Sequence, residues 1–143
     1  MAFTLAKGDA KVMWFPKKAS VAIAVGDLLY ADGSGAVQSA DSTSGEHIGV
    51  CMKTIAATDA DYASTTSIPV LVPYDDSEFE VDVDTGTALT TAMVGSQYDL
   101  TDANSLNVGA QSKKVVTITK FISATKALVK INAMIHNDNV ATT

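Results

Sequence analysis

From residue 20 onward, short runs of Val, Ile, Thr and Tyr are separated by clusters of Gly, Asp, Asn and Ser. Turn clusters that recur about every 8–12 residues are typical of an all-β sandwich or barrel. Asp32-Gly33-Ser34-Gly35 is a turn signal. We expect surface loops at 58–66 and 101–112 and at most one helical turn within 85–93, where Gly86 disfavours a longer helix. The predicted strands are 21–25, 28–31, 48–55, 68–73, 78–83, 97–100, 115–122 and 127–135.

An internal repeat extends this pattern. Val25-Gly26 opens a segment that resembles the one opened by Val94-Gly95, 69 residues later, and residues 52–58 resemble residues 119–125, 67 residues later. Two copies in the same order predict a mainly β fold, a small β-barrel built from duplicated β-units related by a pseudo-twofold. Chance similarity in a sequence rich in Val, Thr and Ala is the alternative. Two copies at this period are too few for a solenoid.

The N-terminal segment differs from the rest in charge and in pattern. Residues 1–20 hold four lysines against one aspartate, a net charge of +3, whereas the remaining residues hold six lysines against fifteen acids, −9. The segment shows neither clean alternation nor a helical stripe, so we interpret residues 1–19 as an extended N-terminal arm, residues 20–135 as the barrel and residues 136–143 as a polar tail. The candidate anchors of the arm are Phe3, Leu5, Trp14 and Phe15, with Lys17 and Lys18 as electrostatic help. The alternative is a first strand packed into its own domain.

Composition excludes several classes of function. The whole chain carries −6, and all ten basic residues are lysine. Nucleic-acid binders use basic patches and arginine forks, so no nucleic-acid partner is expected. The longest apolar run, 21–25, is too short to cross a membrane, which takes about 20 residues. One cysteine, Cys51, cannot form an internal disulfide, which indicates synthesis in a reducing cytoplasm.

The most conspicuous polar feature is an acidic stretch at 75–84. Along a strand successive side chains face opposite ways, so Glu78, Glu80, Asp82 and Asp84 are predicted to share one face. Ligands on every second residue of a rigid strand do not wrap a cation, which disfavours a calcium site, and no aromatic platform supports a glycosidase pair. A solvated face that discourages edge-to-edge aggregation and an acidic docking stripe for lysines remain open.

No catalytic constellation is recognisable. The histidines, His47 and His136, lie outside any nucleophile–base motif, and Cys51 is interpreted as a small buried thiol in a strand. No nucleophile elbow, phosphate loop or zinc motif occurs. We therefore expect no enzyme activity, no cofactor and no metal.

The run Gly45-Glu46-His47-Ile48-Gly49-Val50, followed by 64–72 and 77–83, resembles the head-decoration (capsid cement) proteins of tailed bacteriophages. Lambda-type members carry a Val-Gly-Ile-Leu segment, a Ser-Thr-Thr-Leu strand and a hairpin at corresponding places. The upstream strand and turn at 28–35 fit the same pattern, so the resemblance covers residues 25–84. The repeated second half departs from the compact lambda type and is more like other small capsid-associated β proteins.

The resemblance implies a structural virion protein, a homotrimer on the outer surface of a capsid, which stabilises the shell. It also implies that the N-terminal arm docks by strand addition to the major capsid protein. The alternative function is a carbohydrate- or host-surface-binding β module, such as a head-fibre component, whose mark would be aromatic residues clustered in loops.

Overall fold

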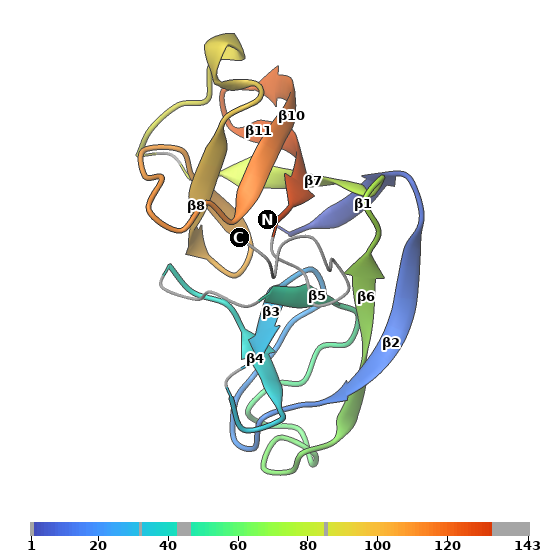
Figure 1. Cartoon of the computed structure of the whole chain (residues 1–143). Helices are drawn as coiled ribbons and strands as arrows, with labels where there is room; N and C mark the ends of the chain where they lie inside the picture. Colours follow the sequence, from blue (N-terminus) through green and yellow to red (C-terminus); the bar gives the residue numbers. More distant parts are fainter. Residues whose placement is uncertain (1, 32, 43–46, 85, 133–143) are drawn as a thin grey trace.

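The computed structural model describes residues 2–31, 33–42, 47–84 and 86–132 of the chain, and these residues form strands arranged in two lobes (Figure 1). The strands belong to two sheets, one from each half of the sequence, with β1 added to the second. A single 3₁₀ turn, Thr91–Met93, lies in the segment where at most one helical turn is expected. The strands are β1 (Thr4–Lys7), β2 (Ala10–Pro16), β3 (Leu28–Ala31), β4 (Val37–Ser39), β5 (His47–Cys51), β6 (Ser67–Pro73), β7 (Glu78–Val83), β8 (Gln97–Asp102), β9 (Ser105–Asn107), β10 (Val116–Ser123) and β11 (Lys126–Ile131).

The two sheets have the same topology. We call β2 to β6 the first unit and β7 to β11 the second unit. The first unit has the strand order β2-β6-β5-β3-β4, and the second has the order β7-β11-β10-β8-β9. Replacing each strand of the first unit by the strand five places later in the chain therefore gives the second. The predicted mainly β fold with duplicated units is confirmed.

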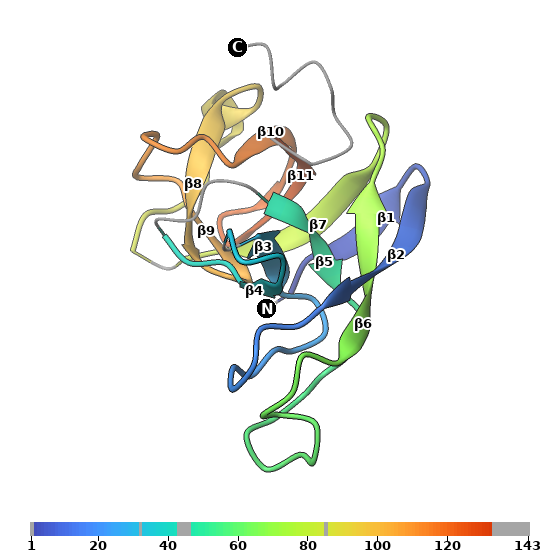
Figure 2. The same ribbon diagram turned by 60° about the horizontal axis from the view of Figure 1, so that its bottom comes forward.

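Each unit closes, or nearly closes, into a barrel by a parallel contact between its first and third strands. In the second unit β7 pairs with β9 through Asp82↔Ser105 and Val83↔Leu106, which completes a five-stranded barrel. In the first unit the corresponding contact is one parallel bridge, Lys17↔Val37, just beyond the end of β2. Figure 2 shows both lobes from a second direction.

The repeat noticed in the sequence marks equivalent turns. Gly26 N–H donates to the Cys51 carbonyl over 2.9 Å, and Gly95 N–H donates to the Ile118 carbonyl over 2.8 Å. The two glycines have φ angles of +92° and +91°, in the region where side chains other than glycine are strained. The Val-Gly pair therefore occurs twice in the chain because the same turn is built twice.

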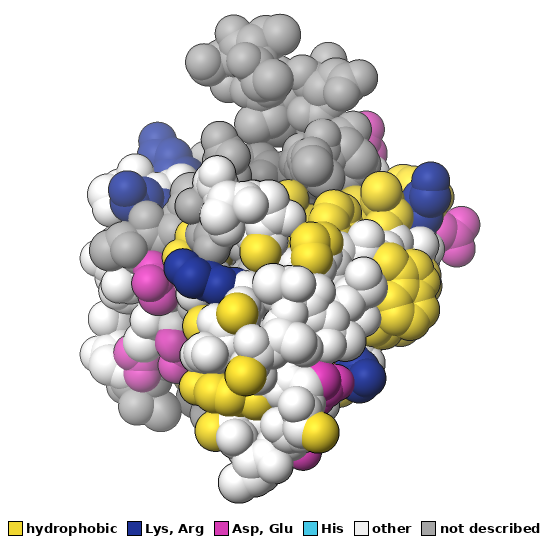
Figure 3. All heavy atoms as spheres, turned by 90° about the horizontal axis from the view of Figure 1, so that it is seen from below, with side chains coloured by type: hydrophobic (Ala, Val, Ile, Leu, Met, Phe, Trp, Pro, Cys, Tyr) yellow, Lys and Arg dark blue, Asp and Glu magenta, His cyan; other side chains and the backbone are white. Residues whose placement is uncertain are grey.

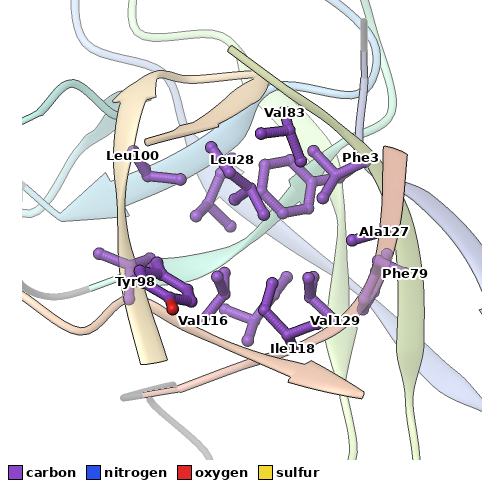
Figure 4. Packing of buried hydrophobic residues seen from close by; sticks show 14 of the residues in the cluster. Phe3, Leu28, Phe79, Val83, Tyr98, Leu100, Val116, Ile118, Ala127 and Val129 are labelled. Atoms are coloured by element: carbon purple, nitrogen blue, oxygen red, sulfur yellow. The ribbon is translucent and has the colours of Figure 1, made fainter. Parts of the chain in front are cut away.

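The main core fills the second unit (Figure 4). Phe79, Val116, Ile118 and Val129 line the barrel, and Leu28 of the first unit enters the same cluster, so the two units share one core. A second cluster, built on Ile48, Ile68, Val70 and Val72 with neighbours from the loops, lies inside the first unit.

Residues 2–19 do not form a separate arm in this structure, which corrects the interpretation drawn from the sequence. Strand β1 pairs with β7, and β2 pairs with β6 over seven consecutive residues from Ala10 to Pro16. Phe3, with 3% of its surface exposed, meets Phe79 edge to face, with ring centroids 6.5 Å apart. Burial of such a ring is worth about 2 kcal/mol, so the chain's own core holds the segment in place. The predicted tail, 136–143, lies outside the described residues.

Three details of the strand prediction differ from the structure. Residues 21–25 make only one bridge, Ile23↔Ile55, instead of a strand. The three-residue strands β4 and β9 were not expected from the sequence, and β9 lies in a predicted loop.

Candidate functional site: the open edge and apolar face of β2

Strand β2 lies at the edge of the first sheet. It pairs with β6 on one side, and within the described part of the chain no strand pairs with its other side between Ala10 and Phe15. An uncovered strand presents unpaired N–H and C=O groups, which are a template for pairing with another chain. The edge is seven residues long and regular in register, and only Pro16, at its end, lacks an N–H.

One face of β2 is apolar and exposed. Trp14 is 64% exposed, the highest value among the exposed large hydrophobic residues of the described chain, and Val12 is 47% exposed. In register with them on β6 are Pro69 and Leu71, of which Leu71 is half-buried and also packs against the main core. Met52, 42% exposed, donates its N–H to the Pro69 carbonyl. We call these five residues the Trp14 face. Figure 3 shows hydrophobic side chains gathered on the side of the molecule where β2 lies.

Burial of the exposed Trp14 side chain by a partner would contribute substantial binding free energy. A Trp side chain has up to about 250 Å² of surface. At about 25 cal/mol per Å², the exposed 64% corresponds to about 4 kcal/mol that burial by a partner would recover. Trp is also among the residue types enriched at positions that dominate binding energy at interfaces.

The second unit shows that the fold does not require this apolar face. The Lys17 N–H donates to the Thr66 carbonyl just as the Val83 N–H donates to the Thr125 carbonyl, over 2.9 and 2.8 Å. This equivalence places Val12 and Trp14, 66 residues earlier, at the positions of Glu78 and Glu80. The duplicated position is therefore apolar in one unit and acidic in the other.

The acidic residues lie on one face of β7, as the alternation predicts. Phe79, Val81 and Val83 are buried on the other face. Glu78 accepts a hydrogen bond from the Thr119 hydroxyl over 2.7 Å. Lys126 Nζ lies 3.3 Å from Glu80 and 3.6 Å from Asp82, and Asp84 accepts a hydrogen bond from the Thr101 hydroxyl over 3.2 Å.

These contacts compensate part of the acidic charge within the chain. The hydrogen bond from Lys126 to Glu80, together with the two nearby carboxylates, raises the pKa of Lys126. Docking of a neighbour's lysine onto Glu78, Glu80, Asp82 and Asp84 stays a prediction.

Lys17 is buried and has a structural role. Its side chain is fully enclosed, and its ammonium donates hydrogen bonds to the carbonyls of Lys18, Val21 and Tyr62 over 2.7, 3.0 and 2.9 Å. The ammonium also lies 5.6 Å from the centroid of the Tyr62 ring. Burial lowers the pKa of Lys17, while the charge of Asp61 opposes that shift.

The six anchors proposed from the sequence therefore divide into two groups. Phe3 is buried in the main core, Leu5 packs against the same core, and Phe15 packs against the core of the first unit. With Lys17, these side chains hold the chain's own fold together. Trp14 and Lys18 are exposed. The sequence reasoning missed Val12, Met52, Pro69 and Leu71, although the Glu residues at equivalent positions of the repeat were a signal for Val12.

Other polar groups of the interior are held by structural contacts. Burial alone would raise the pKa of Asp99, but N–H groups of Lys114, Lys113 and Ser112 and the Ser112 hydroxyl lower it. The Cys51 thiol is buried and donates to the Lys53 carbonyl over 3.0 Å, and burial raises its pKa to about 11. Both groups fasten loops to strands.

The described residues form neither a candidate metal centre nor a membrane-spanning helix. Their His, Cys, Asp and Glu side chains include no group of three or more that could hold a metal ion. No helix of the described chain has the length and apolar character needed to span a membrane. His47 is buried, and His136 lies outside the described residues.

The loop at 58–66 does not provide the aromatic platform that a glycan-binding module would use. Its aromatic residue, Tyr62, is half-buried and lies beside the Lys17 ammonium. Its carbonyl is also used twice, by Lys17 and by the Ser20 N–H. This arrangement gives Tyr62 a role in packing the loop onto the segment that follows β2.

Comparison with known proteins gives no match, either to a protein-family model or to a curated protein.

Proposed function

We propose that this chain is a structural virion protein that binds the outer surface of a phage capsid and stabilises it. The observation that carries the proposal is the contrast between the two units: one surface strand is apolar and open, and its counterpart is acidic and covered. A protein with one exposed apolar strand on an otherwise acidic body is suited to binding the surface of another protein. The resemblance to head-decoration proteins names the shell as the object of attachment.

The charge distribution supports an outward position. A net charge of −6 with no arginine is unfavourable beside packaged DNA, whose phosphates would repel it, and is compatible with the outside of a shell. Many copies on a symmetric shell would also turn one modest contact per copy into a large total stabilisation, because binding to the assembled state shifts the assembly equilibrium. The partner in this proposal is the major capsid protein, and the assembled form is a homotrimer.

The proposed attachment surface is the Trp14 face in place of a free arm. The large apolar side chains that remain exposed on the N-terminal segment, Val12 and Trp14, lie on β2. Deleting residues 1–19 would remove β1 and β2 and would damage both sheets. Point substitutions on β2 are therefore the appropriate test.

The experiment compares Trp14→Glu with Val94→Glu in binding to expanded capsids of the phage that encodes the chain. Val94 is 45% exposed, so the two variants change charge equally and both replace an exposed apolar residue. The fold should tolerate Trp14→Glu, because Glu80 occupies the equivalent position. We expect Trp14→Glu to weaken capsid binding by at least about 30-fold, equivalent to about 2 kcal/mol, and Val94→Glu to bind as the native chain does.

The measurements are occupancy per capsid by quantitative gel analysis and the temperature at which shells release DNA. Native protein that does not decorate capsids in stoichiometric amounts would refute the proposal. Equal occupancy by the two variants would refute the assignment of the surface.

A further inference from the structure

The second unit contains a strand that covers the edge equivalent to the open edge of β2. Strand β1 adds to β7 in antiparallel orientation, with Thr4 opposite Glu80, Leu5 opposite Phe79 and Lys7 opposite Glu78. Because the two units are equivalent, the edge of β2 that corresponds to the β1-paired edge of β7 is the backbone from Val12 to Trp14. Nothing in the described chain adds to that edge.

The backbone of β2 is oriented to accept a strand there. In an antiparallel ladder, residues alternate between those that bond to the neighbour and those whose N–H and C=O point away from it. The Lys17 N–H donates to the carbonyl of Thr66, the residue just before β6, and the register of β2 with β6 is unbroken. The N–H and C=O groups of Val12 and Trp14 therefore point away from β6, as those of Glu78 and Glu80 point toward β1.

We propose that the β2 edge binds an extended segment of a partner protein as a sixth strand, antiparallel to β2 and in the register that β1 adopts on β7. The inference rests on the proposed function for the identity of the partner, the capsid protein. The site itself is defined by the chain alone: the outward backbone groups of Val12 and Trp14 supply hydrogen bonds, and the Trp14 face supplies an apolar contact.

Charge indicates the chemistry of the added segment. On the second unit a basic residue of β1, Lys7, lies opposite the acidic Glu78. The β2 edge has the opposite sign, because Lys11 is exposed on the strand and Lys18 is exposed just beyond it. The matching segment therefore alternates apolar residues with carboxylates. Like charges facing each other across a strand pair are destabilising, which disfavours a basic segment.

The test uses a blocked peptide of alternating glutamate and valine, seven residues long to match β2, and a control peptide with lysine in place of glutamate. Binding is followed by amide chemical shifts of the full chain. We expect saturable shifts at Val12 to Phe15 with the acidic peptide, and affinity for the basic peptide lower by at least about fivefold. Shifts confined to another edge, or equal affinity for the two peptides, would overturn the inference.

Two variants separate backbone pairing from side-chain contact. Val12→Pro removes an outward N–H, a position at which edge strands tolerate proline, and should weaken peptide binding by at least about tenfold. Val12→Thr keeps that N–H and should bind within about threefold of the native chain, since only one methyl group is exchanged. Lys11→Glu, which leaves the backbone intact, should reverse the preference between the peptides. Unchanged binding by Val12→Pro, or an unchanged preference in Lys11→Glu, would count against the strand-acceptor site.

The two proposals fail in different ways. If the peptide binds β2 but native protein does not decorate capsids, the capsid assignment is wrong and the strand-acceptor site stands. If capsids are decorated equally by the native chain and by Val12→Pro, attachment does not use the edge and the inference is wrong.

Discussion

Replacement of the buried Lys17 by methionine provides a direct test of how the first unit is held together. The substitution keeps an unbranched side chain of similar length and removes the ammonium, with its hydrogen bonds to the carbonyls of Lys18, Val21 and Tyr62. Hydrogen bonds to a charged donor are worth about 1.5–3 kcal/mol each, but methionine avoids the cost of burying a charge, and the Tyr62 carbonyl keeps the Ser20 N–H as a donor. We expect a net loss of about 3 kcal/mol.

The assay is urea-induced unfolding followed by far-ultraviolet circular dichroism, with a thermal scan in parallel. A loss of that size should lower the melting temperature by about 10 °C for a chain of this length. The matched control is Lys11→Met, which removes an exposed lysine from β2, the strand that Lys17 directly follows, and should change stability by less than about 0.5 kcal/mol. If both variants are equally stable, the Lys17 ammonium does not stabilise the loops that hold the Lys18, Val21 and Tyr62 carbonyls. If Lys17→Met instead loses only salt-dependent partner binding, the sequence-based role of Lys17 as electrostatic help would be right.

Three further predictions concern other parts of the chain. Because N–H donors lower the folded-state pKa of Asp99, its contribution to stability is present at neutral pH and is lost as pH falls below about 4. The Asp99→Asn variant should therefore be less stable than the native chain at neutral pH and should lose less stability on acidification. Urea titrations of both proteins at neutral and acidic pH would measure this difference. The Cys51 pKa of about 11, against an ordinary 9.0, predicts that a disulfide reagent labels the folded chain at least about a hundredfold more slowly than the unfolded chain, and rapid labelling of the native protein would contradict the burial of this thiol. Gly95→Ala should cost about 1 kcal/mol from backbone strain alone, and Gly26→Ala about 2 kcal/mol or more because its Cβ would lie 2.2 Å from that of Ala2; equal costs in chemical denaturation would show that the N-terminus is loosely held.

The fold could be predicted from the sequence where side-chain chemistry alternates with the strand period. Strand β7 is the clearest case, since its acidic and apolar residues alternate without interruption and the faces follow from that pattern. The repeat was also detectable, because the turns at Gly26 and Gly95 need a backbone conformation that glycine adopts most easily. The short strands β4 and β9 could not be predicted, since three residues carry too little pattern.

The candidate site was harder to predict, for a physical reason. Strand β2 is apolar on both faces: Met13 and Phe15 pack against the inner cluster, while Val12 and Trp14 face solvent. A sequence pattern that reports hydrophobicity cannot tell a side chain that is buried by its own chain from one that awaits a partner. The opposite problem affects Lys17, which the sequence suggests is a charge available to a partner but which the fold buries. Its burial could not be predicted, because the Tyr62 carbonyl that accepts its hydrogen bond lies 45 residues away in the sequence.

The duplication resolves this ambiguity, because each unit is a reference for the other. Two copies of one topology have the same needs for turns, buried faces and closure, and at those points the units agree, as the glycine turns and the parallel closing contacts show. At the first strand of each unit, the shared topology does not require the difference in residue type, because both residue types occur at equivalent positions. The outer face and edge of the first strand differ in both chemistry and pairing. Glu80 lies on a strand whose edge pairs with β1, whereas Trp14 lies on a strand whose edge is open. An apolar residue that the fold does not need, at an edge that the fold elsewhere covers, is the observation that the proposed strand-acceptor site on β2 accounts for.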